Sequence, residues 1–523
     1  MLVRGKDLTV DDVHRVAVGG EIVRIDEDQL KLVAESCDRI QRWGAEGHPI
    51  YGVTTGFGEM VHMSVPARFE AELQENLLRS HAAGAGLLFP DDVVRAALLS
   101  RLNCLSKGYS GVSVEALELM AEFLNRRIHP VVPQQGSLGA SGDLAPLSHL
   151  ALPLIGAGAV RYRGEVVDSA TVLSDLGLRP VRLGYKDGLA LINGTSVMTG
   201  AASLALVRAE RLLRLALWAS AAFIQIMRGS TRAFEKYGHE LKNHRGQSEV
   251  AEIISELLAG SALTVTHEDV MRLVRDASGD ELVDAGNYLQ NAYTVRCVPQ
   301  ILGPVVDAIR YCRRIVEEEL NSCNDNPLIF ESPETVFHGG HFHGQYVAMA
   351  SDFLNIAVTE IGVLAERQLN RLLDPHLNKT YPAFLTLGEP GVTCGLQGAQ
   401  YLATSIASEN LDLAAPASIK TIPSNGQNQD VVSMGLIAAR KSLQLTDNVQ
   451  TIVSVLVAAV YQASAITGAE QFSPGVRGLL TLLGTTTPAY EDGGGVASDF
   501  LATIRETLLL GEAGELLPQM GES

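Results

Sequence analysis

The stretch GSLGASGDLAPL, residues 136–147, is the most informative part of this chain for its fold and chemistry. At its centre, Ala140, Ser141 and Gly142 are small residues that allow the backbone to fold back on itself. Glycine permits this because it has no Cβ, alanine adds little bulk, and serine contributes a hydroxyl group. A lone Ala-Ser-Gly sequence is nearly always an ordinary turn, so its meaning depends on the segments that accompany it.

The composition is that of a large acidic protein with a sizeable core. The chain has 523 residues, of which 46% are hydrophobic, and a formal net charge of −19. This length favours several domains. Nucleic-acid and anionic membrane surfaces need clustered Lys and Arg, so we expect neither a nucleic-acid nor a membrane partner.

The cysteines and the N-terminus favour a cytoplasmic location. The six cysteines are scattered without CxxC pairing, as is typical of reduced thiols in the cytosol. The first residues, MLVRGKD, contain no apolar segment of a secretory signal. The apolar stretch 215–227 is too short to span a bilayer, and 451–468 carries Gln462 and many small residues. We expect both to be buried helices.

Helical periodicity dominates the chain. Apolar residues at i, i+3 and i+4 predict helices over residues 91–103, 114–127, 201–228, 305–321, 345–373 and 399–412, with a terminal helix near 498–510. Strand-like alternation is confined to short pieces such as 160–167. The segments 201–228 and 436–467 contain neither Gly nor Pro and no sustained heptads, which predicts long antiparallel helices in a bundle.

The expected fold class is therefore all-α. We expect three successive regions along the chain. They are an N-terminal, loop-rich region (residues 1–190), a central long-helix bundle (191–475) and a C-terminal helical region (476–523).

Two glycine-containing segments flank the central tripeptide in sequence. Residues 51–59, YGVTTGFGE, place three glycines in seven positions between Tyr51 and Glu59, a pattern that suits a mobile lid. By local sequence alone, Tyr51 would more often be a packing residue. Residues 191–196, LINGTS, place Asn193 at a helix-start signal. They also form a glycosylation sequon, which has no meaning in a cytosolic protein.

Polar side chains form further segments. In NAYTVRCVPQ (291–300), Tyr293 and Arg296 would face the same way on a helical turn, and an arginine fork suits a carboxylate, although a surface ion pair is the simpler interpretation of an isolated arginine. In HGGHFHG (338–344), His341 and His343 could both reach one metal ion. We consider that the weaker alternative and expect no metal.

Amides concentrate in PSNGQNQDVVSM, residues 423–434. Asn425, Asn428 and Gln429 could hold a pocket through hydrogen bonds or form a polar loop that satisfies itself. Gly156 and Gly158 do not complete GxGxxG, so we expect no nucleotide.

In this order, the segments resemble those of the histidine and aromatic amino-acid ammonia-lyases and aminomutases. These enzymes build the electrophile 4-methylideneimidazol-5-one (MIO) from Ala-Ser-Gly. The resemblance implies that the Gly142 nitrogen attacks the Ala140 carbonyl carbon and that two waters leave, so that Ser141 becomes an exocyclic methylidene. It also implies the all-α ammonia-lyase fold and a homotetramer whose sites combine three chains.

The resemblance also implies roles for single residues. Tyr51 would remove a β-proton, which requires the site to stabilise its phenolate because a free phenol keeps its proton at neutral pH. Asn193 would donate to the MIO oxygen as negative charge grows there. The remaining roles are a position beside MIO for Tyr293, carboxylate binding for Arg296, and pocket lining for Phe342. The family usually has Asn where this chain has His341.

Substrate and outcome follow from three positions. Histidine-specific members have a glutamate where this chain has Gln429, and His81, in NLLRSH (76–81), is one position on from the histidine typical of bacterial tyrosine ammonia-lyases. The segment around Glu59, together with Arg79, Ser80 and His81, resembles the corresponding segments of bacterial tyrosine 2,3-aminomutases. We therefore expect conversion of L-tyrosine to β-tyrosine through 4-coumarate, with ammonia-lyase side activity. The alternatives are a tyrosine ammonia-lyase, which would release 4-coumarate and ammonia, and a non-catalytic helical scaffold.

Overall fold

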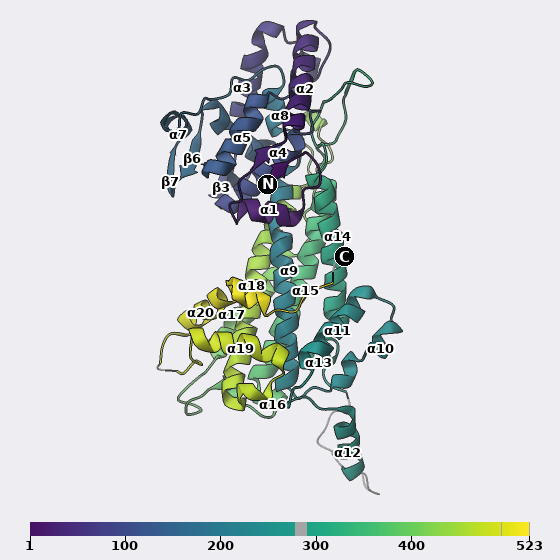
Figure 1. Ribbon diagram of the computed structural model, residues 1–523, viewed down its shortest axis with the longest axis vertical. Helices are drawn as coiled ribbons and strands as arrows, with labels where there is room; N and C mark the ends of the chain where they lie inside the picture. The colour runs from purple at the N-terminus through teal and green to yellow at the C-terminus, as the bar shows by residue number, and fades with distance from the viewer. Residues whose placement is uncertain (278–289, 493, 522–523) are drawn as a thin grey trace. The chain divides into compact units, whose positions relative to one another are not determined.

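The computed structural model describes the chain except residues 278–289, 493 and 522–523, and the described part is mostly helical (Figure 1). It forms two compact units, each assembled from distant segments. Unit 1 comprises Met1–Val207, Tyr311–Phe353 and Ala415–Leu443; unit 2 comprises Arg208–Arg310, Leu354–Ala414 and Gln444–Ser523. The three regions expected from the sequence are continuous segments, whereas each unit combines separate segments, and the three regions stay a proposal.

Most helices lie entirely within one of the two units. Those of unit 1 are α1 Val10–Ala17, α2 Glu27–Ala45, α3 Glu70–His81, α4 Asp91–Leu105, α5 Val114–Arg126, α6 Leu144–Ala151, α7 Ser169–Asp175 and α8 Asp187–Ile192. Those of unit 2 are α10 Lys236–Glu240, α11 Arg245–Leu258, α12 His267–Ala277, α13 Tyr293–Arg296, α16 Pro375–Asn378, α17 Gln397–Leu413, α19 Pro474–Thr486, α20 Ala497–Leu509 and α21 Gly511–Glu515. Short 3₁₀ helices are η1 Gly58–His62, η2 Ala67–Phe69, η3 Leu152–Ile155, η4 Thr231–Phe234, η5 Ala383–Leu385, η6 Asn425–Gln427 and η7 Ala469–Gln471.

Four long helices contribute residues to both units. They are α9 Ser196–Ile226, α14 Val298–Leu320, α15 Gln345–Leu373 and α18 Gly435–Thr467. Within unit 2, the Ser220 hydroxyl of α9 donates to the Gln368 side chain of α15 at 3.2 Å. Gly362 of α15 faces Val449 of α18, where an added Cβ would lie 3.0 Å from a valine methyl group. Small residues thus let these helices approach closely.

The strands are short and lie in unit 1. They are β1 Leu2–Val3, β2 Arg24–Ile25, β3 Ala85–Leu88, β4 His129–Pro130, β5 Pro133–Gln135, β6 Ala159–Tyr162, β7 Glu165–Asp168, β8 Leu328–Phe330 and β9 Thr335–Phe337. β1 pairs with β2 in parallel; β3–β5, β4–β6–β7 and β8–β9 are antiparallel. In the β6–β7 hairpin Val160 lies opposite Val167, as the alternation over 160–167 predicts.

The periodicity predictions are confirmed for every helix named from the sequence; α15 has the predicted ends, and the ends of the others are shifted. The largest shift is in α14, which begins at Val298 rather than 305. Pro299 lies in its first turn, where the missing N–H costs nothing, and the helix continues through Pro304.

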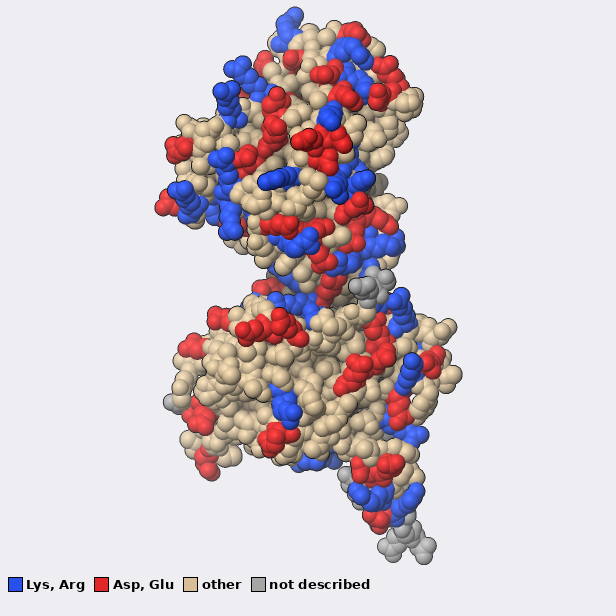
Figure 2. Space-filling view, viewed as in Figure 1, with Lys and Arg blue, Asp and Glu red and all other residues tan. Residues whose placement is uncertain are grey.

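In the part of the chain that the structure describes, two helices, α15 and α18, are long and apolar enough to cross a membrane by length and composition alone. Within their most apolar windows, 72% and 78% of the residues are buried in the structure, so both are core helices. On the face shown in Figure 2, acidic and basic side chains are interspersed.

Three helices position the site in unit 1. α3, α6 and α8 pack against one another, and α4 lies behind them with every residue from Val93 to Leu105 buried. The loop before α6 carries the Ala-Ser-Gly segment.

Candidate active site

The Ala-Ser-Gly segment lies in a turn with left-handed backbone angles. Gly139, Ser141 and Gly142 have φ angles of +87°, +51° and +77°, values that suit glycine and strain serine. The Gly142 amide donates to the Gly139 carbonyl oxygen at 3.4 Å, and a Cβ at position 142 would collide with the Gly194 carbonyl oxygen. The backbone therefore folds back on itself at this turn, and its packing against Gly194 requires glycine at position 142.

Asp143 anchors the turn to the start of α9. Its amide donates to the Gly194 carbonyl oxygen at 2.7 Å, and the Gly194 amide donates to the Ser141 carbonyl oxygen at 3.2 Å. Its carboxylate accepts from the Met198 amide at 2.7 Å and from the Ser137 hydroxyl at 3.1 Å. Burial raises the pKa of Asp143 to about 7, against the lowering effect of these hydrogen bonds.

Asn193 follows the last residue of α8 and lies beside the turn. Its side chain is buried and lines the same cavity as Ser141. Within the described residues, its Oδ1 atom has no hydrogen-bond partner, and an unpaired buried polar atom is costly. Rotation about χ2 exchanges the amide oxygen and nitrogen, so that the nitrogen can donate to an acceptor in the cavity. The orphaned amide and the turn together fit the MIO group.

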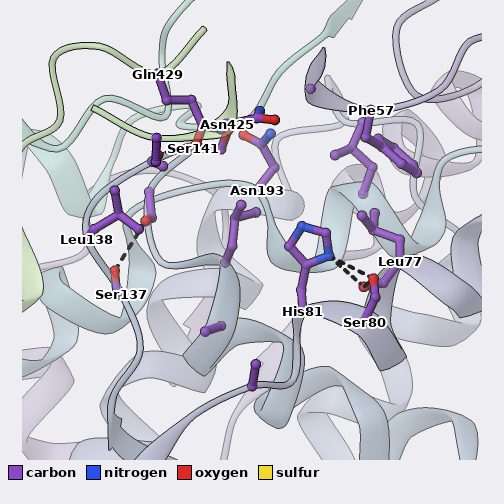
Figure 3. A pocket seen from close by; sticks show the side chains of 18 of the residues that line it. Phe57, Leu77, Ser80, His81, Ser137, Leu138, Ser141, Asn193, Asn425 and Gln429 are labelled. Atoms are coloured by element: carbon purple, nitrogen blue, oxygen red, sulfur yellow. Dashed lines mark hydrogen bonds between the residues drawn. The ribbon is translucent and has the colours of Figure 1, made fainter. Parts of the chain in front are cut away.

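A cavity of about 620 Å³ opens beside the turn (Figure 3). Leu73 and Leu77 of α3 and Leu189 of α8 form part of its apolar lining, and Asn76 and Ser80 add polar groups from α3. This volume is within the range of small-molecule sites, and the mixed lining suits an aromatic ring with a polar substituent.

Tyr51 lines this cavity and holds a defined hydrogen bond. Its phenolic oxygen accepts from the Gly58 amide at 3.0 Å, and its own amide donates to Nε2 of His338 at 3.2 Å. Its ring stands edge-on to Phe57, with centroids 6.2 Å apart. The phenolic oxygen is thus held at a fixed position in the wall of the cavity, as a general base needs to be.

His81, the last residue of α3, also lines the cavity (Figure 3). Its Nδ1 lies 3.0 Å from the Leu77 carbonyl oxygen and 3.0 Å from the Ser80 hydroxyl. Because a carbonyl oxygen can only accept, this geometry places the proton on Nδ1. In this tautomer Nε2 is available as an acceptor, which suits a phenolic hydroxyl.

The lid segment touches the amide-rich loop. The Glu59 amide donates to Oδ1 of Asn425 at 3.3 Å, and a Cβ at Gly426 would lie 2.8 Å from a carboxylate oxygen of Glu59. Asn425 lines the cavity, whereas Glu59 is exposed beside the turn η6. The structure therefore places Glu59 at a contact between η1 and η6 and not in the lining of either cavity, so its predicted substrate-binding role stays a prediction.

A second cavity, of about 360 Å³, shares Tyr51, Ala140 and Ser141 with the first. Phe342 and Asn428 line only this second cavity, and Gln429 lines both. The Ser424 hydroxyl donates to the side-chain oxygen of Gln429 at 3.2 Å. The tripeptide is thus accessible from two sides.

Comparison with known proteins identifies the family. A model of the aromatic amino acid lyase family matches residues 8–484. The chain belongs to this family. The tyrosine 2,3-aminomutase of Chondromyces crocatus is 60% identical over 494 residues, which are 94% of this chain and 93% of that protein. The MIO-dependent tyrosine 2,3-aminomutase of Streptomyces globisporus is 47% identical over 89% of this chain and 87% of that protein.

The fold agrees with the family. A crystal structure of tyrosine aminomutase from Streptomyces globisporus matches with a TM-score of 0.94 and 42% identity, covering 99% of this chain and 97% of that chain. The predicted family and its ammonia-lyase fold are confirmed.

Two residues with roles implied by the family resemblance lie in unit 2. Tyr293 and Arg296 form α13, and the Arg296 guanidinium lies over the Tyr293 ring, 4.8 Å from its centroid. Arg296 also donates to the Asn291 carbonyl oxygen, and Tyr293 is 68% exposed. Neither residue lines the two cavities of unit 1, so their predicted roles at the site stay predictions.

The histidine-rich segment makes separate contacts. The His341 ring stands edge-on to Phe337 at 5.1 Å, and Nε2 of His343 lies 3.2 Å from the Val431 carbonyl oxygen. Among the residues that the structure describes, no group of three or more His, Cys, Asp or Glu side chains could hold a metal ion.

Several site residues were not predicted. Leu73, Asn76, Leu77 and Ser80 occupy i, i+3, i+4 and i+7 of α3, and a helical reading of residues 70–81 would have found them. Arg101, which contacts the Asn193 carbonyl group from behind, leaves no local signal, because its partners are distant in sequence.

Proposed function

We propose that this protein is a tyrosine 2,3-aminomutase, which converts L-tyrosine to β-tyrosine through enzyme-bound 4-coumarate. The observation that carries the proposal is one cavity lined by three chemical groups. They are the Ala-Ser-Gly turn, a tyrosine whose phenolic oxygen accepts a backbone amide, and a histidine with an available acceptor nitrogen.

We infer that Ala140, Ser141 and Gly142 close into MIO without an external cofactor. Asn193 and the Gly194 backbone would hold the group, and its oxygen would meet the orphaned Asn193 amide. When formed, MIO would supply an electrophilic carbon for the amine of the substrate.

Tyr51 is the base in this proposal. Its phenolate removes the β-proton, and the Gly58 amide stabilises the negative oxygen. The leucines around the ring exclude water and hold the aryl group in place. His81 accepts the para-hydroxyl proton in a hydrogen bond and so fixes the ring.

The remaining side chains shape substrate choice. Gln429 offers a neutral amide where an imidazole substrate would favour a carboxylate, so histidine is disfavoured. Asn425, Asn428 and Phe342 line the cavity walls and contact the substrate or MIO. Glu59, on the lid, acts through closure or through the substrate amine.

Assembly completes the site. We propose a homotetramer in which Arg296 of one chain binds the substrate carboxylate, and Tyr293 lies beside MIO, at the cavity of another chain. Tyr346, Met349 and Phe353 form an exposed apolar row on α15, 71%, 57% and 43% exposed, and such a row favours burial against a partner.

The location we propose is the cytoplasm. The six cysteines, all of which the structure describes, form no disulfide bonds with one another, as expected in a reducing compartment.

The outcome of the reaction depends on the lid. Both the mutase and the alternative tyrosine ammonia-lyase form 4-coumarate, and a tenfold change in partition needs only about 1.4 kcal/mol. In this proposal the hydrogen bond from the Glu59 amide to Asn425 helps to hold the lid closed, and a closed lid would retain the acid for the mutase reaction.

One assay tests the proposal. Purified protein and its Ser141→Ala variant are incubated with L-tyrosine, and the products are separated by chiral chromatography. We expect β-tyrosine from the parent alone, with minor 4-coumarate. Formation of 4-coumarate without β-tyrosine would identify the protein as the lyase. If neither protein forms a product, the non-catalytic scaffold is the remaining alternative.

A further inference from the structure

A buried cation lies behind the candidate site. Arg101 of α4 is 0% exposed, and the oxygens that its guanidinium contacts belong to neutral carbonyl and amide groups. Burial of a charge without a carboxylate partner is costly. Its contacts therefore have to perform a task that an apolar side chain could not.

Arg101 clamps the C-terminal end of α8. Its Nη2 donates to the carbonyl oxygens of Ala190 and Asn193, the latter at 2.6 Å, and its Nη1 donates to Oδ1 of Asn324 at 2.9 Å. The last carbonyl groups of a helix have no partner within the helix, and here a guanidinium takes that place.

Gly194 lies between this clamp and the Ala-Ser-Gly turn. A Cβ at Gly194 would collide with Nη1 of Arg101 and with Oδ1 of Asn324. Its backbone amide and carbonyl group bond to Ser141 and Asp143, respectively. The guanidinium thus sets how closely the 193–194 backbone approaches the turn.

A second buried contact braces the other end of α8. Lys186, immediately before α8, forms an ion pair with Asp325 at 2.6 Å, and both side chains are 0% exposed. Asp325 follows Asn324, which Arg101 holds. The segment 324–325 is therefore tied to both ends of α8, the helix that presents Asn193.

We propose that Arg101 is a positioning residue for MIO formation, because it holds Asn193 and Gly194 against the closing turn. The inference rests on the proposed function. In the closure, a bond forms between the Gly142 nitrogen and the Ala140 carbonyl carbon. The Ala140 oxygen leaves as water with the Gly142 and Ser141 amide hydrogens, and the Ser141 hydroxyl leaves as water with its Cα hydrogen. No oxidant or reductant is needed.

Arginine suits this task better than lysine. A planar fork donates in two fixed directions at once, here to the Asn193 carbonyl group and to Asn324, whereas an ammonium group cannot hold both in that geometry.

Arg95 provides a matched control. It lies on the same helix, is 5% exposed, and donates to the carbonyl oxygens of Val16, Ala17 and Leu124, which lie outside the site. Loss of Arg95 removes a comparable clamp without touching α8.

The test is the intact mass of purified full-length Arg101→Met and Arg95→Met, with helix content checked by circular dichroism. Ring closure lowers the mass by two waters. We expect Arg95→Met to be fully dehydrated, and the dehydrated fraction of Arg101→Met to fall about tenfold or more, since hydrogen bonds to a charged donor are lost. Equal dehydration of the two variants would overturn the inference.

If Arg101→Met does not fold, Arg101→Lys and Arg95→Lys decide. A smaller dehydrated fraction in Arg101→Lys supports the positioning role, and equal fractions overturn it. A parent protein that lacks the two-water deficit would instead refute the proposed function, so the two failures are distinguishable.

Discussion

At the scale of single residues, His81 owes its chemistry to its neighbours. The Leu77 carbonyl oxygen holds the Nδ1 proton, which leaves Nε2 as an acceptor. In the proposed function, one hydrogen bond in a largely apolar cavity distinguishes a para-hydroxyl group from a para-hydrogen.

We predict that His81→Leu lowers kcat/KM for L-tyrosine by about 10- to 100-fold, since a para-hydroxyl left without an acceptor costs about 1–3 kcal/mol. The kcat/KM for L-phenylalanine should remain unchanged or increase. Ser80→Ala is the control, because it leaves the contact between Nδ1 and Leu77 intact. If His81→Leu keeps the same selectivity for L-tyrosine over L-phenylalanine, a group other than His81 binds the para-hydroxyl.

Asp143 gives the folded chain a measurable pH dependence. Its pKa is raised from 3.8 to about 7, mainly by burial, so the folded chain binds this proton more tightly than the unfolded chain does. The stability that it contributes is fully present below pH 3.8 and is lost as the pH rises through about 7.

We predict that the Tm of the parent falls relative to that of Asp143→Asn between pH 4 and pH 8, since the asparagine cannot ionise. Thermal melts at several pH values in this window measure the difference. Parallel curves for the two proteins would contradict the assignment.

At the scale of elements, the lid helix η1 and the turn η6 meet at backbone positions of positive φ. Gly58, Asn425 and Gly426 have φ angles of +54°, +52° and +60°, and a Cβ at Gly58 would collide with the Asn425 side chain. The two segments can therefore approach closely enough for the Glu59 amide to bond to Asn425.

We predict that Asn425→Ala raises the ratio of 4-coumarate to β-tyrosine by about three- to tenfold, because a lost hydrogen bond of roughly 0.5–1.5 kcal/mol lets the lid open before the amine returns. The measurement is the product ratio with L-tyrosine. Gln427→Asn is the matched control, since Gln427 is exposed in the same turn and asparagine tolerates its φ of +66°. An unchanged ratio in Asn425→Ala would rule out the contact as a determinant.

At the scale of the whole molecule, the residues that we propose for the active site come from different units. Ser141 and Tyr51 line a cavity of unit 1, whereas Arg296 is part of unit 2. If a partner chain supplies Arg296, two defective chains can repair each other.

We predict that co-expression of Ser141→Ala and Arg296→Met restores about one quarter of the parent activity, because random assembly brings the two intact residues together in that fraction of sites. Ser141→Ala with Tyr51→Phe is the control pair and should remain inactive, since both residues line one cavity of one chain. Activity no higher than that of the separate variants would place Arg296 within its own chain's site.

The sequence by itself determined the family and the helical fold, and it led to the function that we propose. Long apolar segments without Gly or Pro can bury their surface only as packed helices, which is why α9 and α18 were predictable. The motif residues were predictable from their order along the chain. Ala140 to Gly142, Asn193 and Gln429 lie in segments that follow one another as they do in the family.

Only the tertiary structure decided how those residues are held. Arg101, Gly194 and Asn324 meet because α4, the end of α8 and the segment after α14 converge, and no periodicity encodes such a contact. The acceptor face of His81 and the raised pKa of Asp143 also depend on groups brought close in space. Hydrogen-bond direction and desolvation are properties of a packed environment, and the linear order of residues does not contain them.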